Sequence, residues 1–168
     1  AIIHQLTLEE KAFLCVGGSY WRTASIPRLN IPNIMVIDGP SGINKLEIKS
    51  DHTCPRVESE NSILFPCSSC TCCSFDRDIM YCMGEAIGDE LVKEGIQIIL
   101  GPGVNIKRSP LCGRNFEYFS EDPYLSSKMS GPFIKGVQSK GVGCCIKHFA
   151  AYNQESFRFF VSSNVDER

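Results

Sequence analysis

Short apolar runs alternate with longer amphipathic stretches along much of the chain. The runs at residues 34–37, 96–100 and 143–146 are typical of buried strands, since each is four or five residues long and ends at a turn residue or a charge. Between them, apolar residues recur at helical spacing over residues 79–91 and 125–137. The order strand, helix, strand, helix, strand predicts an α/β fold with parallel strands, either a doubly wound sheet or a (β/α)8 barrel.

Residues that begin or end helices stand at the edges of these patterns. Two side chains can cap a first helical turn: Thr7 and Asp122. Two glycines can end a helix: Gly95 and Gly141. The middle helix is expected to bury four residues spaced four apart: Ile79, Met83, Ile87 and Leu91. Residues 44–62 are polar, and we expect them to be irregular.

Composition narrows the class of protein. The chain has 168 residues, of which 43% are hydrophobic and 21% charged, enough for one globular domain with a core. A net charge of −2 does not suggest a nucleic-acid partner. No apolar run approaches the roughly 20 residues of a membrane-spanning helix, so we expect no membrane partner. The N-terminal residues lack the features of a signal peptide, and a cytoplasmic location is expected.

Ten cysteines are many for this length, and four of them lie in the segment CSSCTCC at residues 67–73. A zinc site could be built from four side chains in and near this segment: His52, Cys54, Cys67 and Cys70. Its spacing is unusual, because a second CxxC pair is lacking. We therefore favour free cysteines that fill small apolar spaces, including Cys144 and Cys145, and we expect no metal, cofactor or disulfide framework.

Polar side chains follow each of the three predicted strands. Asp38 comes directly after the first, Arg114 and Glu117 lie in the loop after the second, and Lys147 and His148 end the third. Carboxyl ends of parallel strands meet at one edge, where ligands bind in both parallel architectures. Such donors and acceptors suit a polyhydroxylated ligand such as a sugar.

Each of these residues also has a simpler interpretation. Asp38 could bond amides of its own turn, DGPSG. His148 could be a buried histidine with satisfied ring nitrogens, and Arg114 a surface or ion-paired arginine. Trp21 and Phe116 could stack on a ligand, but large aromatic residues more often belong to a core.

Cleavage of a glycosidic bond requires two carboxyl groups, roughly 5 Å apart in retaining enzymes. Three carboxyl groups are conceivable members of such a pair: Asp38, Glu117 and Glu155. None of them stands out as the nucleophile or the proton donor.

Several long motifs give the chain a recognisable family likeness. The stretches IPRLNIPNIMVIDGPSG and GPGVNIKRSPLCGRNFEYFSEDP, with KHF following at residues 147–149, resemble the N-terminal domain of glycoside hydrolase family 3. The resemblance covers nearly all of residues 1–168 apart from residues 45–62. It implies the N-terminal portion of a (β/α)8 barrel, truncated after about half the barrel, because a whole barrel takes about 250 residues.

The resemblance also implies roles for individual residues. Five would line the −1 sugar subsite: Asp38, Arg114, Lys147, His148 and Arg158. Glu117 would support Arg114 from behind. The family's nucleophile, an aspartate in an SDW-like motif, and its acid/base glutamate would lie beyond Arg168, so residues 1–168 would hold no catalytic residue. Tyr152 stands where the family usually has asparagine.

The implied activity is that of a retaining β-glucosidase acting on terminal nonreducing β-D-glucosyl residues of a small β-glucoside or oligosaccharide. The alternative is a noncatalytic sugar-binding or degenerate remnant domain. Residues 1–168 by themselves would be inactive. They would also leave a sheet edge and apolar faces uncovered, which makes self-association an expected property.

Overall fold

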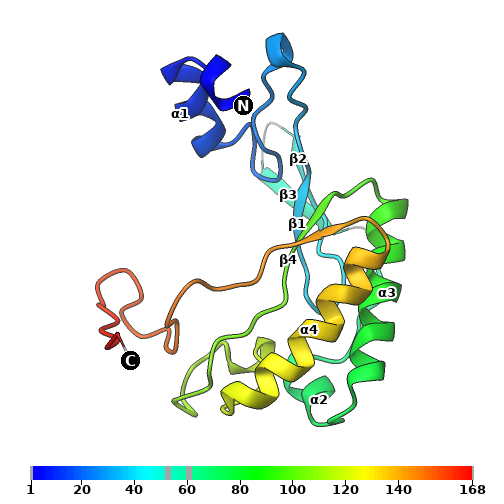
Figure 1. The fold of residues 1–168 in the computed structure, drawn as a ribbon, viewed down its shortest axis with the longest axis vertical. Coiled ribbons are helices and arrows are strands. Elements are labelled where there is room, and N and C mark those ends of the chain that lie inside the picture. Colours follow the sequence, from blue (N-terminus) through cyan, green and yellow to red (C-terminus); the bar gives the residue numbers. More distant parts are fainter. Residues whose placement is uncertain (1, 52–53, 60–61, 168) are drawn as a thin grey trace.

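A computed structural model describes residues 2–51, 54–59 and 62–167, and Figure 1 shows its ribbon. The longer helices are α1 (Leu8–Val16), α3 (Arg77–Lys93) and α4 (Pro123–Ser139), and α2 is short (Ser68–Cys72). The strands are β1 (Val36–Asp38), β2 (Leu46–Asp51), β3 (Cys54–Ser59), β4 (Ile98–Leu100) and β5 (Gly143–Cys144). Three short 3₁₀ helices complete the order: η1 (Ile2–Gln5), η2 (Pro27–Leu29) and η3 (Asn115–Glu117).

The central sheet is parallel, as predicted. Its strand order is β1-β4-β5, and Ile37, Ile99 and Cys144 stand side by side in the register. The strands do not coincide with the apolar runs, and before β1 a side chain takes part in the pairing. The amide of Met35, for example, donates to the Gln97 side chain over 2.8 Å. All three predicted strands exist, in a parallel α/β fold.

The core lies between this sheet and helices α3 and α4, which cover one of its faces (Figure 1). Ile37 and Ile99 project into it from the sheet and are fully buried. The two helices approach closely at glycines. A Cβ atom on Gly136 would lie 2.2 Å from the carbonyl oxygen of Tyr81, and one on Gly84 would lie 2.3 Å from that of Phe133. Small residues are therefore required where α3 crosses α4.

Two of the predictions about local structure are wrong. Ile79 is 50% exposed, and the buried face of α3 begins instead at Met80, followed by Met83, Ile87 and Leu91. A strict spacing of four exceeds the helical repeat of 3.6 residues, so the row drifts off the buried face. Within residues 44–62, β2 and β3 form an antiparallel pair, with Leu46 opposite Ser59. The backbone amide and carbonyl groups of the two strands bond one another, and this pairing does not depend on whether the side chains are polar.

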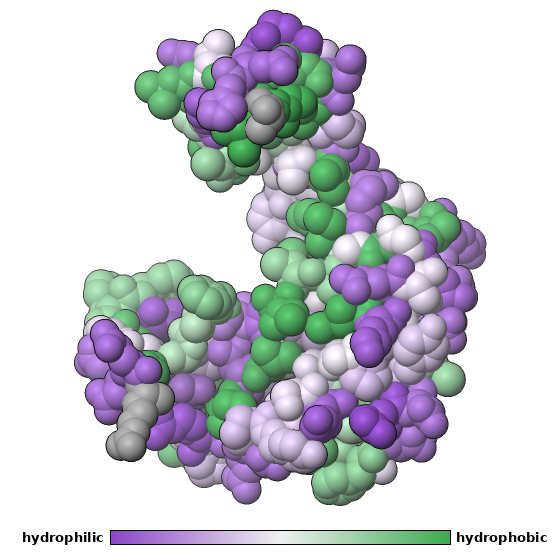
Figure 2. Space-filling model, viewed as in Figure 1, coloured by the Kyte–Doolittle hydropathy of each residue, from purple (hydrophilic) through white to green (hydrophobic). Residues whose placement is uncertain are grey.

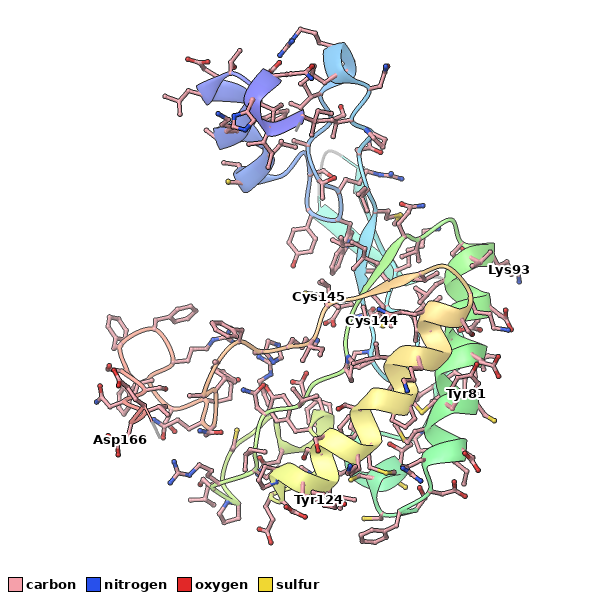
Figure 3. All side chains as sticks on the ribbon, in the orientation of Figure 1. Tyr81, Lys93, Tyr124, Cys144, Cys145 and Asp166 are labelled. Carbon is pink, nitrogen blue, oxygen red and sulfur yellow. The ribbon has the colours of Figure 1, made fainter. Side chains whose placement is uncertain are left out.

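The cysteines do not all fill apolar spaces. Nine of them are free thiols, and only Cys72 and Cys112 among these nine are buried. Five are exposed, against the prediction: Cys15, Cys70, Cys73, Cys82 and Cys145. Cys144 packs against the core while Cys145, the next residue, faces the other way, because side chains alternate along a strand (Figure 3).

The proposed zinc ligands include His52, which lies outside the described residues. Within the parts of the chain that are described, no three His, Cys, Asp or Glu side chains are grouped so that they could hold a metal ion. In those same parts no helix combines the length and the apolar character needed to cross a membrane.

The sheet face opposite α3 and α4 is open. In Figure 1 the segment that follows β5 leaves this side of the sheet and runs to the C-terminus as an irregular arm. Figure 2 shows the resulting concave surface, with apolar residues gathered along its inner wall. The loops that follow β1, β4 and β5 meet beside this concavity.

Candidate functional site

The segments after β4 and β5 run side by side beyond the sheet. The amide of Lys147 donates to the carbonyl of Pro102 (3.1 Å), and the amide of Val104 donates to the carbonyl of Lys147 (2.8 Å). These bonds extend the parallel pairing past the ends of the strands. They place Lys147 next to the carboxyl end of β4, where the predicted site was expected.

Lys147 joins two of the predicted carboxylates. Its Nζ donates to Oδ1 of Asp38 over 2.5 Å and lies 3.7 Å from Oε2 of Glu117. The Lys147 side chain is only 13% exposed, so its ammonium group depends on these partners. Asp38 also accepts from the amide of Gly39 (3.0 Å), so the turn interpretation is correct as well, without excluding a ligand role.

Arg114 lies at the centre of the cluster. Its Nε donates to Oε1 of Glu117, and its Nη2 lies 2.8 Å from Nε2 of His148. The hydrogen bond to Glu117 is the main reason why the pKa of Arg114 is raised above its usual value. Arg114 Nε also lies 3.6 Å from Oε1 of Glu155. The guanidinium group is thus held from three sides.

His148 uses both ring nitrogens within the protein. Nε2 faces Arg114, and Nδ1 lies 2.8 Å from the hydroxyl of Tyr118. An arginine can only donate, so Nε2 accepts and the proton of the neutral ring is on Nδ1. Burial, reinforced by the positive charges of Arg114 and Lys147, lowers the pKa of His148 below its usual value. The ring is therefore neutral at pH 7.

The irregular arm brings Arg158 to the same cluster. Its Nη1 lies 3.5 Å from Oε2 of Glu155, and its guanidinium carbon lies 5.8 Å from the centre of the Tyr152 ring. The hydroxyl of Tyr152 donates to Oε1 of Glu155. Arg114 lies over the same ring at 5.3 Å. Two guanidinium groups therefore lie close enough to the Tyr152 ring to be attracted to it.

All six residues predicted for the site belong to one connected network. It runs through ion pairs and hydrogen bonds in the order Asp38, Lys147, Glu117, Arg114, with His148 on Arg114 and with Arg158 joined through Glu155. Phe116 is exposed and Trp21 packs against the core, so the core interpretation holds for Trp21.

Sequence reasoning missed three members of the site. Tyr118 is buried, and burial raises the pKa of its hydroxyl above the usual value. Asn105 binds the backbone of His148, and the ring of Tyr152 lies close to both Arg114 and Arg158. Asn105 follows β4 at the same sheet edge as the other residues, and that position was a signal that could have identified it.

The charges of the network balance. Its three cations are Lys147, Arg114 and Arg158, and its three carboxylates are Asp38, Glu117 and Glu155. Each of these carboxylates is ion-paired to one of the three cations. The arrangement can donate to and accept from hydroxyl groups of an uncharged ligand, and it leaves none of the three carboxylates unpaired for proton transfer.

A pocket of about 480 Å³ adjoins Lys147 and His148 on the side of the arm. Seven of its twelve lining residues are apolar: Val104, Ile106, Ile146, Phe149, Ala150, Ala151 and Val165. These apolar side chains offer no hydrogen-bonding groups, and the pocket's polar lining is limited to five residues: Asn105, Arg108, Lys147, His148 and Asn153. The charged network consists of hydrogen-bonding side chains, so it suits a polyhydroxylated ligand better than this pocket does.

Comparison with known proteins gives concordant results. Residues 28–160 match the family model described as Glycosyl hydrolase family 3 N terminal domain. The chain is 53% identical over 99% of its length to thermostable beta-glucosidase B from Acetivibrio thermocellus, and 43% identical over 99% of its length to an exo-alpha-(1->6)-L-arabinopyranosidase from Bifidobacterium breve. It spans about a fifth of these relatives, 22% of each.

Solved structures of beta-glucosidases share the fold of this chain. Beta-glucosidase 3B from Thermotoga neapolitana in complex with glucose superposes on 92% of the chain with a TM-score of 0.79 and 40% identity, and the match covers 23% of that protein. A GH3 beta-glucosidase from Bifidobacterium adolescentis superposes on 99% of the chain with a TM-score of 0.83 and 42% identity, again covering 23% of that protein.

Proposed function

Because the chain belongs to glycoside hydrolase family 3, we propose that it supplies the sugar-binding part of a retaining β-glucosidase. The substrate is a small β-glucoside or oligosaccharide, from which a terminal nonreducing β-D-glucosyl residue is removed. Asp38, Arg114, Lys147, His148 and Arg158 hold that residue in the −1 subsite. The nucleophilic aspartate and the acid/base glutamate belong to polypeptide outside residues 1–168.

The connected network is the observation that supports this proposal. Residues from three strand ends and from the irregular arm meet, and two of them, Asp38 and Lys147, are more than a hundred positions apart in the sequence. A pyranose presents adjacent hydroxyl groups that can each donate and accept. The charge-balanced network offers both kinds of partner without attracting an ionic ligand.

The network accounts for binding, while the bond-breaking groups come from elsewhere. Retaining hydrolysis needs a free carboxylate to attack the anomeric carbon and a second carboxyl group to protonate the leaving oxygen. The described carboxylates of the network are tied to Lys147, Arg114 and Arg158. In this proposal the ion pairs orient their hydrogen-bonding atoms toward the sugar, and catalysis proceeds only when the other two groups are supplied.

Two alternatives compete with this proposal. The arabinopyranosidase relative acts on a different sugar, but the β-glucosidase relative is more similar, at 53% against 43% identity. A noncatalytic sugar-binding domain would use the same network without supporting turnover. The experiment must therefore separate binding from hydrolysis.

The test is a graft of residues 1–168 into the Acetivibrio thermocellus enzyme in place of its matching segment. We expect the graft to hydrolyse p-nitrophenyl β-D-glucoside, and the isolated chain to show no turnover above a blank. Asp38→Asn in the graft should lower kcat/KM about 100-fold, since charged hydrogen bonds to two hydroxyls are lost. Asp89→Asn, in an exposed ion pair with Lys140, is the matched control.

A folded graft that binds the glucoside without hydrolysing it would favour the noncatalytic alternative. Equal activity of the Asp38→Asn and Asp89→Asn grafts would refute the assigned role of Asp38.

A further inference from the structure

We propose that Asn105 is a positioning residue: its side-chain amide holds the backbone of His148 and thereby places the side chains of Lys147 and His148. The inference rests on the proposed sugar-binding function, because the network that it positions is the one that would hold the sugar.

The first observation is the pattern of pairing after the sheet ends. Lys147 bonds Pro102 and Val104 through its backbone amide and carbonyl. At the next residue this backbone pairing is replaced by a side chain. Nδ2 of Asn105 donates to the carbonyl of His148 (2.9 Å), and Oδ1 of Asn105 accepts from the amide of His148 (2.5 Å). The amide group of Asn105 thus extends the ladder by one residue.

The second observation is burial. Asn105 is 8% exposed, and its donor and its acceptor are both used on His148. A buried amide is stable only when such partners are present. Carboxylate and aliphatic side chains of similar size cannot supply both bonds: an aspartate would place an oxygen against the carbonyl of His148, and a leucine would leave both backbone groups without these partners.

The third observation is that the ring of His148 makes two hydrogen bonds, which together fix where the ring must lie. Nε2 must meet a donor of Arg114 while Nδ1 meets the hydroxyl of Tyr118. Both contacts are 2.8 Å long, and they come from opposite sides of the ring. A backbone shift of about 1 Å would stretch at least one of them beyond the usual range of a hydrogen bond. The backbone clamp therefore holds the ring where Nε2 accepts from Arg114 and the proton stays on Nδ1.

Two substitutions separate this role from general stability. Asn105→Asp keeps the size of the side chain and the acceptor for the His148 amide, so the fold should be retained. Asn105→Leu removes both bonds. Asn33→Asp is the matched control, because Asn33 is exposed, accepts from Arg22 over 3.3 Å and lies before β1, at the opposite end of that strand from the site.

The readout is the ¹⁵N spectrum of the histidine rings in the 168-residue chain, with the exposed His4 as internal reference. In the parent chain at pH 7 we expect one set of His148 signals, with Nδ1 protonated and Nε2 unprotonated. Both Asn105 variants should shift these signals toward a mixture of tautomers, and Asn33→Asp should not. Binding of methyl β-D-glucoside should weaken about tenfold in Asn105→Asp, the effect of one lost buried hydrogen bond.

Unchanged His148 ring signals in a folded Asn105→Asp chain would overturn the inference, whether or not Asn105→Leu folds. If the parent chain binds no glucoside, the proposed function fails. The ring spectra would still decide whether Asn105 positions His148, so the two failures are distinguishable.

Discussion

Lys147 is the residue on which the electrostatic argument can be tested most directly. Its ammonium group forms an ion pair with Asp38 and also lies near Glu117, whose side chain is 12% exposed. Replacing it in Lys147→Met keeps most of the aliphatic stem and leaves the two carboxylates without this neutralising charge. Breaking a fully buried pair costs roughly 3–5 kcal/mol, whereas an exposed pair contributes about 0.2–1 kcal/mol.

The ion pair between Lys147 and Asp38 is neither fully buried nor fully exposed, so its energy should lie between these two ranges. Asp38 is 42% exposed, so water compensates part of the loss, and Glu117 keeps its bond to Arg114. We therefore expect Lys147→Met to lower the free energy of unfolding by about 2 kcal/mol. Asp38→Asn should lower it by about 1 kcal/mol, and the double variant should be less destabilised than the sum of the two by about 1 kcal/mol.

Urea unfolding of the chain at pH 7, followed by the fluorescence of Trp21, measures these free energies. Trp21 is the chain's single tryptophan and packs against the core. The control cycle uses Lys140→Met and Asp89→Asn, an exposed pair 3.2 Å apart, for which the coupling should be below about 0.5 kcal/mol. Equal coupling energies in the two cycles would show that Lys147 is not buried between its partners, and the reasoning would be refuted.

Two further predictions concern packing and pH. Gly136→Ala should lower the free energy of unfolding by about 1–3 kcal/mol, because the added methyl would meet the Tyr81 carbonyl 2.2 Å away. Thermal unfolding measures this loss. The control is Ser127→Ala at an exposed position, which should change the free energy of unfolding by no more than about 0.5 kcal/mol. Since folding lowers the pKa of His148, the unfolded chain takes up a proton first as the pH falls, and stability should decrease below about pH 6.5. Unfolding at pH 7 and 5.5 measures that decrease, which should be smaller in His148→Gln; an equal decrease in both proteins would contradict the assignment.

Much of the site could be predicted because strand ends are visible in a sequence. Asp38, Arg114 and Lys147 each follow an apolar run, and parallel pairing brings such ends to one edge. Arg158 follows no strand, and it entered the prediction only through the family resemblance. Its position depends on the path of the arm, for which local sequence contains no periodic signal.

The parts that could not be predicted depend on tertiary partners. Asn105 bonds the backbone of His148 rather than a side chain, so the residues next to it in the sequence do not indicate its role. Tyr118 looks like an ordinary aromatic core residue until His148 is placed against its hydroxyl. Ile79 has a helical spacing from Met83, but a row of residues four apart drifts around the helix, and the face of α3 that is buried begins at Met80 instead.

The ion pairs of the network have a consequence for sugar binding beyond neutralising charge. Long side chains such as Arg114 and Lys147 lose rotamer freedom when they grip a ligand, which weakens binding by roughly 0.5–1.5 kcal/mol for each side chain immobilised. Here Glu117, Asp38 and Glu155 hold them in place before any sugar arrives. Most of that entropy is therefore lost during folding rather than during binding. A network of opposite charges can in this way favour an uncharged ligand, because it orients donors and acceptors while leaving no net charge to be neutralised.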